Sequence, residues 1–128
     1  MTKENTMHQT SQIATEELAR LLTTLSHRHR IGIIEELRSG EKDVSTLSDI
    51  LKISRSRVSQ HMSLLRSHHL VRERREGRHV YYHLVCSDVA IWLAQGLRFV
   101  ETEIDDTSNI SDAVREVESL WLQSNSDT

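Results

Sequence analysis

Two short helical segments separated by three residues constrain the fold of this chain more than any other feature. Apolar side chains recur at helical spacing over residues 44–51 and again over 55–68, with only Lys52, Ile53 and Ser54 between them. Ser54 stands where a helix N-cap belongs, because its hydroxyl can accept a hydrogen bond from the next turn of backbone. Two helices joined in this way form a helix-turn-helix.

The residues that follow change from a helical to an alternating pattern. Residues 70–75 and 78–84 predict two strands, and Glu76-Gly77 supplies a two-residue turn between them. The remaining helices are predicted over residues 12–25, 28–38, from Ser87 or Asp88 to about 105, and 111–122. The sequence thus predicts a mainly α fold with a small β-hairpin, in the order of four helices, hairpin, long helix and an extra C-terminal helix.

The same patterns divide the chain into three parts. We expect a disordered tail over residues 1–9, one folded domain over 10–106, and a helical extension and tail over 107–128. No apolar run approaches the roughly 18 residues of a membrane-spanning helix, and the polar N-terminus lacks the apolar centre of a signal peptide. We therefore expect a cytoplasmic protein with no membrane partner.

Charge is distributed unevenly along the chain. The formal net charge is −3, yet residues 54–83 hold seven arginines and only two acidic residues. Residues 84–128 hold two arginines and nine acidic residues. A basic middle inside an acidic protein indicates a directed surface, although a solvated charged face is the alternative interpretation.

A helical wheel separates the second helix of the motif into two faces. Val58, Met62 and Leu65 share one sector, and His61 lies nearer to this apolar sector than to the other. The opposite sector is polar and free of acidic residues, as a helix face that enters the major groove of DNA should be. The interpretation of His61 as a histidine packed against the core is favoured over a role as a base reader or ligand.

The hairpin continues the basic surface. Arginines near its tip could contact the DNA minor groove or backbone, whereas arginines on a hairpin edge can also serve to prevent aggregation. The predicted DNA contacts from helix and hairpin together are Ser54, Arg55, Ser56, Arg57, Ser59, Gln60, Ser63, Arg75, Arg78 and His79.

Three segments resemble the ArsR/SmtB family of bacterial repressors. They are residues 25–31, the pattern S-x-S-x-V-S-x-H from Ser54, and the pattern L-V-x-x-R-x-E-G-R-x-V-Y-Y from Leu70. The resemblance covers about residues 12–105 and implies a winged helix-turn-helix that binds an inverted repeat and releases it when a signal is sensed. One departure is His27-Arg28, where such proteins often carry Asp-Pro or Asn-Pro, so the second helix is expected to start differently.

The resemblance also implies which residues contact DNA and which residues join two subunits. By that likeness Ser56, Ser59 and Gln60 are closest to the bases, and a homodimer is built on the first helix and the long helix after the hairpin. The predicted dimer interface is Ile13, Leu18, Leu21, Leu22, Ile91, Trp92, Leu97, Val100 and Ile104.

None of the sensor sites familiar in this family is intact. Asp43 and Ser45 stand at the Cys-x-Cys position, Phe99 and Thr102 stand at two ligand positions of the long helix, and residues 28–37 contain no cysteine. Cys86 is the only cysteine, whereas members that sense sulfur species use two. We therefore expect no metal or cofactor, while a metal site shared across a dimer, with Cys86, Asp88 or a histidine, stays open.

These observations favour a homodimeric, sequence-specific DNA-binding regulator that acts as a repressor. The alternative is a winged-helix module for protein interaction and dimerisation without sequence-specific DNA binding. An enzyme is not expected, since the chain has no glycine-rich phosphate loop, nucleophile elbow or paired carboxylates. The extra C-terminal helix, with Val114, Val117 and Trp121 on one face, could pack against the first helix of the other subunit or cover a ligand pocket.

Overall fold

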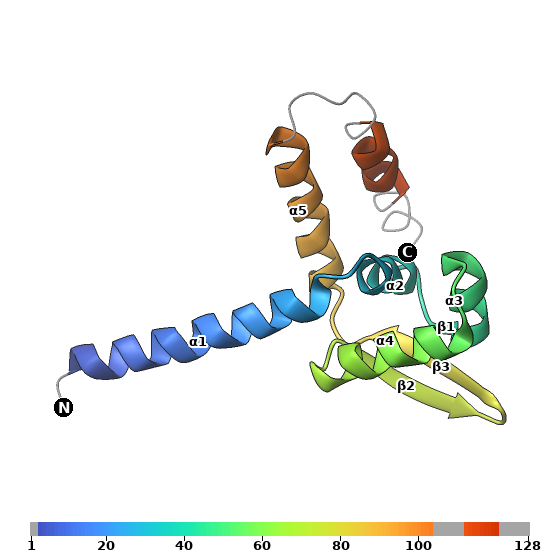
Figure 1. The fold of residues 1–128 in the computed structure, drawn as a ribbon, viewed down its shortest axis with the longest axis horizontal. Coiled ribbons are helices and arrows are strands. Elements are labelled where there is room, and N and C mark those ends of the chain that lie inside the picture. The colour runs from blue at the N-terminus through green and yellow to red at the C-terminus, as the bar shows by residue number, and fades with distance from the viewer. Residues whose placement is uncertain (1–2, 104–111, 121–128) are drawn as a thin grey trace.

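The computed structural model describes residues 3–103 and 112–120 (Figure 1). In chain order its elements are α1 (Lys3–Leu25), α2 (Arg28–Leu37), β1 (Lys42–Asp43), α3 (Val44–Leu51), α4 (Arg55–Ser67), β2 (Val71–Glu76), β3 (His79–Leu84) and α5 (Asp88–Glu103). A further helix covers residues 112–120. Within these described residues, no helix combines the length and apolarity needed to cross a membrane. The arrangement is a winged helix-turn-helix, as predicted.

The three strands form one antiparallel sheet in the order β1-β3-β2. β2 and β3 pair from Val71 opposite Leu84 to Glu76 opposite His79. β1 adds a short edge in which Lys42 lies opposite Tyr82. The sequence predicted only the hairpin, because the two residues of β1 are too few to show an alternating pattern.

The hairpin turn lies one residue further along the chain than predicted. β2 ends at Glu76 and β3 begins at His79, so the turn is Gly77-Arg78 rather than Glu76-Gly77. Gly77 has φ of 60°, a left-handed backbone conformation that glycine adopts without steric cost. The shift moves Arg78 out of the predicted strand and places it at the tip of the hairpin.

α1 begins at Lys3, whereas the sequence predicted a disordered tail over residues 1–9 and a helix from Gln12. The prediction relied on an apolar stripe, which the first residues lack. They also contain no proline or glycine, so nothing in them interrupts a helix. The Thr10 hydroxyl donates to the carbonyl of Thr6 at 2.9 Å, within the added part of the helix.

The core lies where α2, α3, α4 and the sheet meet. α2 contacts α1, α3, α4, α5 and β3, and is therefore the central element of the domain. The side chains buried together are Leu25, Ile33, Ile34, Leu37, Leu47, Val58, Met62, Leu65, Val71, Tyr82 and Ala90. Val58, Met62 and Leu65 come from the apolar sector that the helical wheel assigned to α4.

The helix over residues 112–120 runs beside α5 (Figure 1). Two ion pairs join them, Arg98 Nε to Glu118 Oε1 at 3.3 Å and Arg115 Nε to Glu101 Oε1 at 3.8 Å. Val114 is buried, at 5% exposure, so the predicted apolar face has a partner within the same chain. Trp121, which was assigned to that face, lies outside the described residues.

Leu65→Ala should lower the free energy of unfolding by about 2–5 kcal/mol, because it opens a cavity beneath α4 where Leu65 is 0% exposed. The matched control is Leu64→Ala, the next residue on the same helix, which is 48% exposed. The control should cost about 0.5 kcal/mol or less. Urea unfolding followed by circular dichroism measures both, and equal losses would contradict this assignment of the two faces.

Candidate nucleic-acid interface

α4 is anchored on one face and open on the other. Ser54 caps it, since the Ser54 hydroxyl oxygen accepts a hydrogen bond from the Arg57 backbone N–H at 3.2 Å. Val58, Met62 and Leu65 fix the inner face in the core. The outer face is solvent-exposed and carries Arg55, Ser56, Ser59, Gln60 and Ser63, with no acidic side chain among them.

The short connection from α3 sets how α4 is presented. Lys52 has φ of 57°, which turns the chain sharply after α3. The Ser48 hydroxyl then donates to the Ile53 carbonyl at 2.6 Å, and Arg55 Nη2 donates to the Ser45 hydroxyl at 3.0 Å. Sequence analysis did not single out Ser45 for this contact, because its partner is ten residues away and the bond depends on the angle between the two helices.

The hairpin β2–β3, which we call the wing, uses its arginines in two different ways. Arg74 is engaged within the protein: its guanidinium contacts Glu41 at 2.6 Å and Glu76 at 2.7 Å, and it lies 4.6 Å above the Tyr81 ring. These hydrogen bonds lower the pKa of Glu41 and raise that of Arg74. Arg75 lies 3.5 Å from Glu73 but its side chain is 74% exposed, and Arg78 at the tip is exposed as well, so both can meet another molecule.

A shared cleft of about 260 Å³ connects α4 to the wing. Arg55 and Ser59 line it from α4, Arg78 and His79 line it from the wing, and Ser45 completes it from α3. The structure therefore brings together four of the predicted DNA contacts from two elements. The other six, namely Ser54, Ser56, Arg57, Gln60, Ser63 and Arg75, are exposed outside the cleft lining.

One carboxylate borders this basic cleft. Asp43 caps α3, where its Oδ1 accepts from the Thr46 N–H at 2.9 Å, and hydrogen bonds to Thr46 lower the pKa of Asp43. Its other oxygen lies 3.7 Å from Nδ1 of His79. Asp43 thus caps α3 and also lies beside His79, with which it lines the cleft.

His61 belongs to the inner side of α4, as the helical wheel favoured, and is 8% exposed. Its ring meets those of His27 and His29, with centroids 4.5 and 5.8 Å away. His27 also caps α2, because its Nδ1 accepts a hydrogen bond from the His29 N–H. It does so at the position where similar proteins often carry the Asp or Asn of Asp-Pro or Asn-Pro. Local sequence patterns could not reveal this cluster, since His61 is more than 30 residues from the other two.

Apolar side chains of α1 and α5 are left open to solvent. Of the predicted dimer-interface residues, Ile13, Leu18, Leu22, Ile91, Trp92 and Val100 are 40–62% exposed, and Leu21 and Leu97 are partly buried. Ile104 lies outside the described residues.

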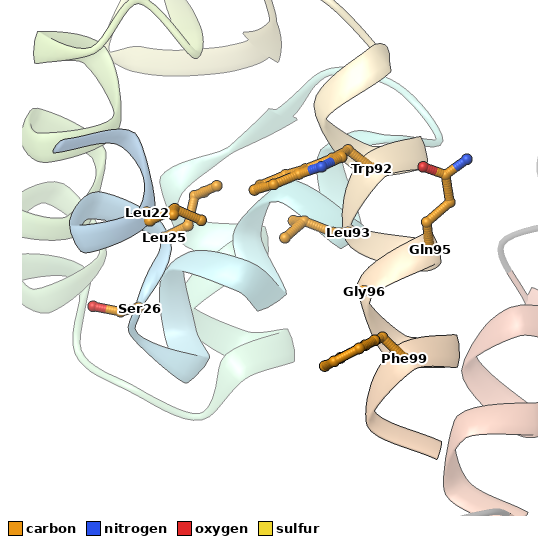
Figure 2. Close-up of a pocket in the computed structure, with 8 residues that line it drawn as sticks. All are labelled: Leu22, Leu25, Ser26, Trp92, Leu93, Gln95, Gly96 and Phe99. Carbon is orange, nitrogen blue, oxygen red and sulfur yellow. The ribbon is translucent and has the colours of Figure 1, made fainter. Parts of the chain in front are cut away.

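A cavity of about 480 Å³ lies between the end of α1 and α5 (Figure 2). Trp92, Leu93 and Phe99 point from α5 towards Leu22 and Leu25 of α1. The apolar surface left open by α1 and α5 therefore includes a concave part as well as the exposed side chains of the two helices.

Among the residues that the structure describes, no group of three or more His, Cys, Asp or Glu is arranged to hold a metal ion. Cys86 is exposed and forms no disulfide. Phe99, which stands at a ligand position of the family's long-helix site, is 68% exposed.

Comparison with known proteins matches residues 27–73 to the family described as bacterial regulatory protein, arsR family. The transcriptional repressor PagR of Bacillus anthracis is 36% identical over 76 residues, which are 59% of this chain and 76% of PagR. The transcriptional repressor SmtB homolog of Synechocystis is 35% identical over 74 residues, 58% of this chain but only 56% of that relative. Reduced HlyU from Vibrio cholerae superimposes with a TM-score of 0.63 at 30% identity, covering 71% of this chain and 96% of that structure.

The chain belongs to the arsR family of bacterial regulatory proteins. Its arsR-family match begins at His27, the cap of α2, and ends at Glu73 within β2. It thus contains α2, α3 and α4 complete, which are the elements that build and support the exposed face of α4. As a member of a family of regulators, the chain is not an enzyme.

Ser54→Ala should destabilise this arsR-family protein by about 1 kcal/mol, because it removes the oxygen that caps α4. Ser54→Asp should restore most of the loss, since a carboxylate caps equally well and complements the helix dipole. Ser56→Ala, two residues after the cap on the exposed face of α4, should change stability by less than about 0.5 kcal/mol. Urea unfolding midpoints compare the three, and an unchanged Ser54→Ala midpoint would show that the cap contributes nothing.

Proposed function

We propose that this chain is a homodimeric transcriptional regulator that binds an inverted repeat in double-stranded DNA through α4 and the wing. The observation that carries the proposal is the exposed face of α4. It is free of acidic residues and joins the wing tip across a common cleft. A protein surface that meets a polyanion should be poor in carboxylates and rich in donors, and the outer face of α4 meets both conditions.

The side chains divide into base readers and backbone contacts. Ser56, Ser59 and Gln60 lie on the outer face of a helix, whose width suits the major groove, and their short polar groups can hydrogen-bond base edges. The remaining residues contact the phosphates, and such contacts fix the position of the protein on the duplex without reading sequence. They are the cap Ser54, the neutral Ser63 and the basic residues Arg55, Arg57, Arg75, Arg78 and His79.

A second copy of the chain would cover the apolar surface of α1 and α5. Six large side chains there are at least 40% exposed, and monomeric proteins seldom leave such clusters open. A two-fold dimer presents two copies of α4 to DNA, so its binding site should be an inverted repeat.

The mode of regulation follows from occupancy of DNA. A regulator that occupies its operator represses most simply by blocking the promoter, and a signal that weakens DNA binding would relieve the block. PagR and the SmtB homolog are named repressors, whereas HlyU of Vibrio cholerae is named an activator. We place the protein in the cytoplasm, where bacterial DNA lies.

The double variant Arg55→Ala with Gln60→Ala should abolish sequence-specific DNA binding and leave the fold intact, because both side chains are exposed. DNase I footprinting on a duplex enriched from random DNA measures the effect. Arg115→Ala is the control, since it removes a positive charge from the helix over residues 112–120 and should retain the footprint. Protection by the double variant at wild-type concentrations would refute the role of α4.

A further inference from the structure

Three imidazole rings meet where the start of α2 packs against the inner side of α4. The centroid of His27 lies 4.5 Å from that of His61 and 5.3 Å from that of His29. His61 is buried, and the other two rings are partly buried. We call these three residues the histidine cluster. None of them lies on the outer face of α4, so the proposed DNA contacts do not use the cluster.

Two hydrogen bonds require uncharged rings in this cluster. His27 Nδ1 accepts from the His29 backbone N–H at 3.1 Å, so this nitrogen carries no proton. Nδ1 of His61 lies 3.3 Å from Nη1 of Arg30, and a guanidinium can only donate, so this nitrogen must accept. Protonation of either ring would remove its acceptor and place two donors face to face.

Arg30 extends the connection to a third helix. Its Nε donates to the Thr24 carbonyl near the end of α1, while Nη1 contacts His61 on α4. The side chain of Arg30 therefore links α1, α2 and α4, and His61 is its contact on α4. Loss of the His61 acceptor would detach α4 from this linkage.

The surroundings oppose a positive charge on the rings. Burial is the largest cause of the lowered pKa of His61, and electrostatic repulsion from His27, Arg30, His29 and Arg57 lowers it further. Desolvation is likewise the largest cause of the lowered pKa of His29, and repulsion from Arg28, His27 and Arg57 adds to it. The charged neighbours that act on these rings thus come from α2 and α4 and are cationic, and α1 presents the uncharged Thr24 carbonyl.

We propose that His61 is a positioning residue for α4, and that protonation of the histidine cluster releases α4 from α2 so that the regulator loses affinity for DNA on mild acidification. This inference rests on the proposed function. His61 and Arg57 are one turn apart on α4, so a movement of His61 also displaces the face that carries Arg55 and Ser59 relative to the wing.

The direction of the pH effect follows from linkage. A histidine in solution has a pKa of about 6.5, and the pKa values of the packed His61 and His29 are lowered from it. The packed arrangement is therefore at full strength well above pH 6.5 and is lost as the pH falls below this value. The loss of DNA affinity is at most about tenfold for each pH unit and each proton taken up.

General electrostatics predicts the opposite sign, which makes the test decisive. Protonation of an exposed histidine such as His79 adds positive charge near the phosphates and strengthens DNA binding. Only a group that must stay neutral in the bound form weakens binding when it is protonated. A loss of affinity in acid therefore points to the interior cluster.

The first measurement uses the free protein and does not depend on DNA. NMR titration of the imidazole resonances should show His61 and His29 titrating below pH 6.5, together with shifts of the α4 amide resonances. Titration of His61 at or above pH 6.5, or a titration that leaves the α4 amides unmoved, would overturn the proposal.

The second measurement uses one fluorescent duplex selected from random DNA at pH 8. It gives the ratio of the affinity of the protein for this duplex at pH 8 to its affinity at pH 5.5. Wild type should bind about tenfold more weakly at pH 5.5. The double variant His27→Asn with His61→Asn keeps both acceptors, because an asparagine oxygen takes the place of the imidazole Nδ1. It cannot take up the protons, so its ratio of affinities at the two pH values should stay within about threefold. The single variant His61→Asn makes the same comparison if the double variant does not fold.

His69→Asn is the matched control, because His69 is exposed beyond the end of α4 and asparagine tolerates its left-handed backbone, with φ of 58°. This control should keep the wild-type ratio. Equal ratios for wild type and the cluster variants would overturn the inference while leaving the proposed function intact. Absence of any selected duplex at pH 8 would instead refute the proposed function, and the inference with it.

Discussion

The burial of one side of α4 and the exposure of its other side organise this domain. Val58, Met62 and Leu65 hold one side against α2, α3 and the sheet, and this anchoring leaves the opposite side open. A rotation of α4 about its axis would bury serines and expose apolar side chains, and both changes cost free energy. The core therefore determines which residues can meet another molecule.

The sheet adds a second fixed element to this arrangement. Arg74 is held by Glu41, Glu76 and the Tyr81 ring, which ties β2 to the loop before β1. Arg75, although paired with Glu73, and Arg78 at the turn remain exposed. The ion pairs of Arg74 and Arg75 leave the wing with less free positive charge than its count of arginines suggests.

Local patterns predicted most of this fold because they record local physics. The apolar stripe of α4, the Ser54 cap and the hairpin alternation each depend on residues within a few positions of one another. The sequence could not reveal the Arg74–Glu41 pair, the Arg55–Ser45 bond or the histidine cluster, because each joins residues that only the packing of helices and strands brings together. The start of α1 was missed because a polar helix carries no apolar period. The roles assigned to the ten DNA contacts and to the apolar face of α1 and α5 stay predictions.

Selection of bound duplexes from random DNA at moderate salt and pH 8 is the sharpest test of α4 as the element that reads DNA. Successive rounds should converge on one sequence arranged as an inverted repeat, because two symmetric copies of α4 would read the two half-sites. A pool that remains random after selection would contradict this role of α4 and would support the interpretation of the chain as a protein-interaction module.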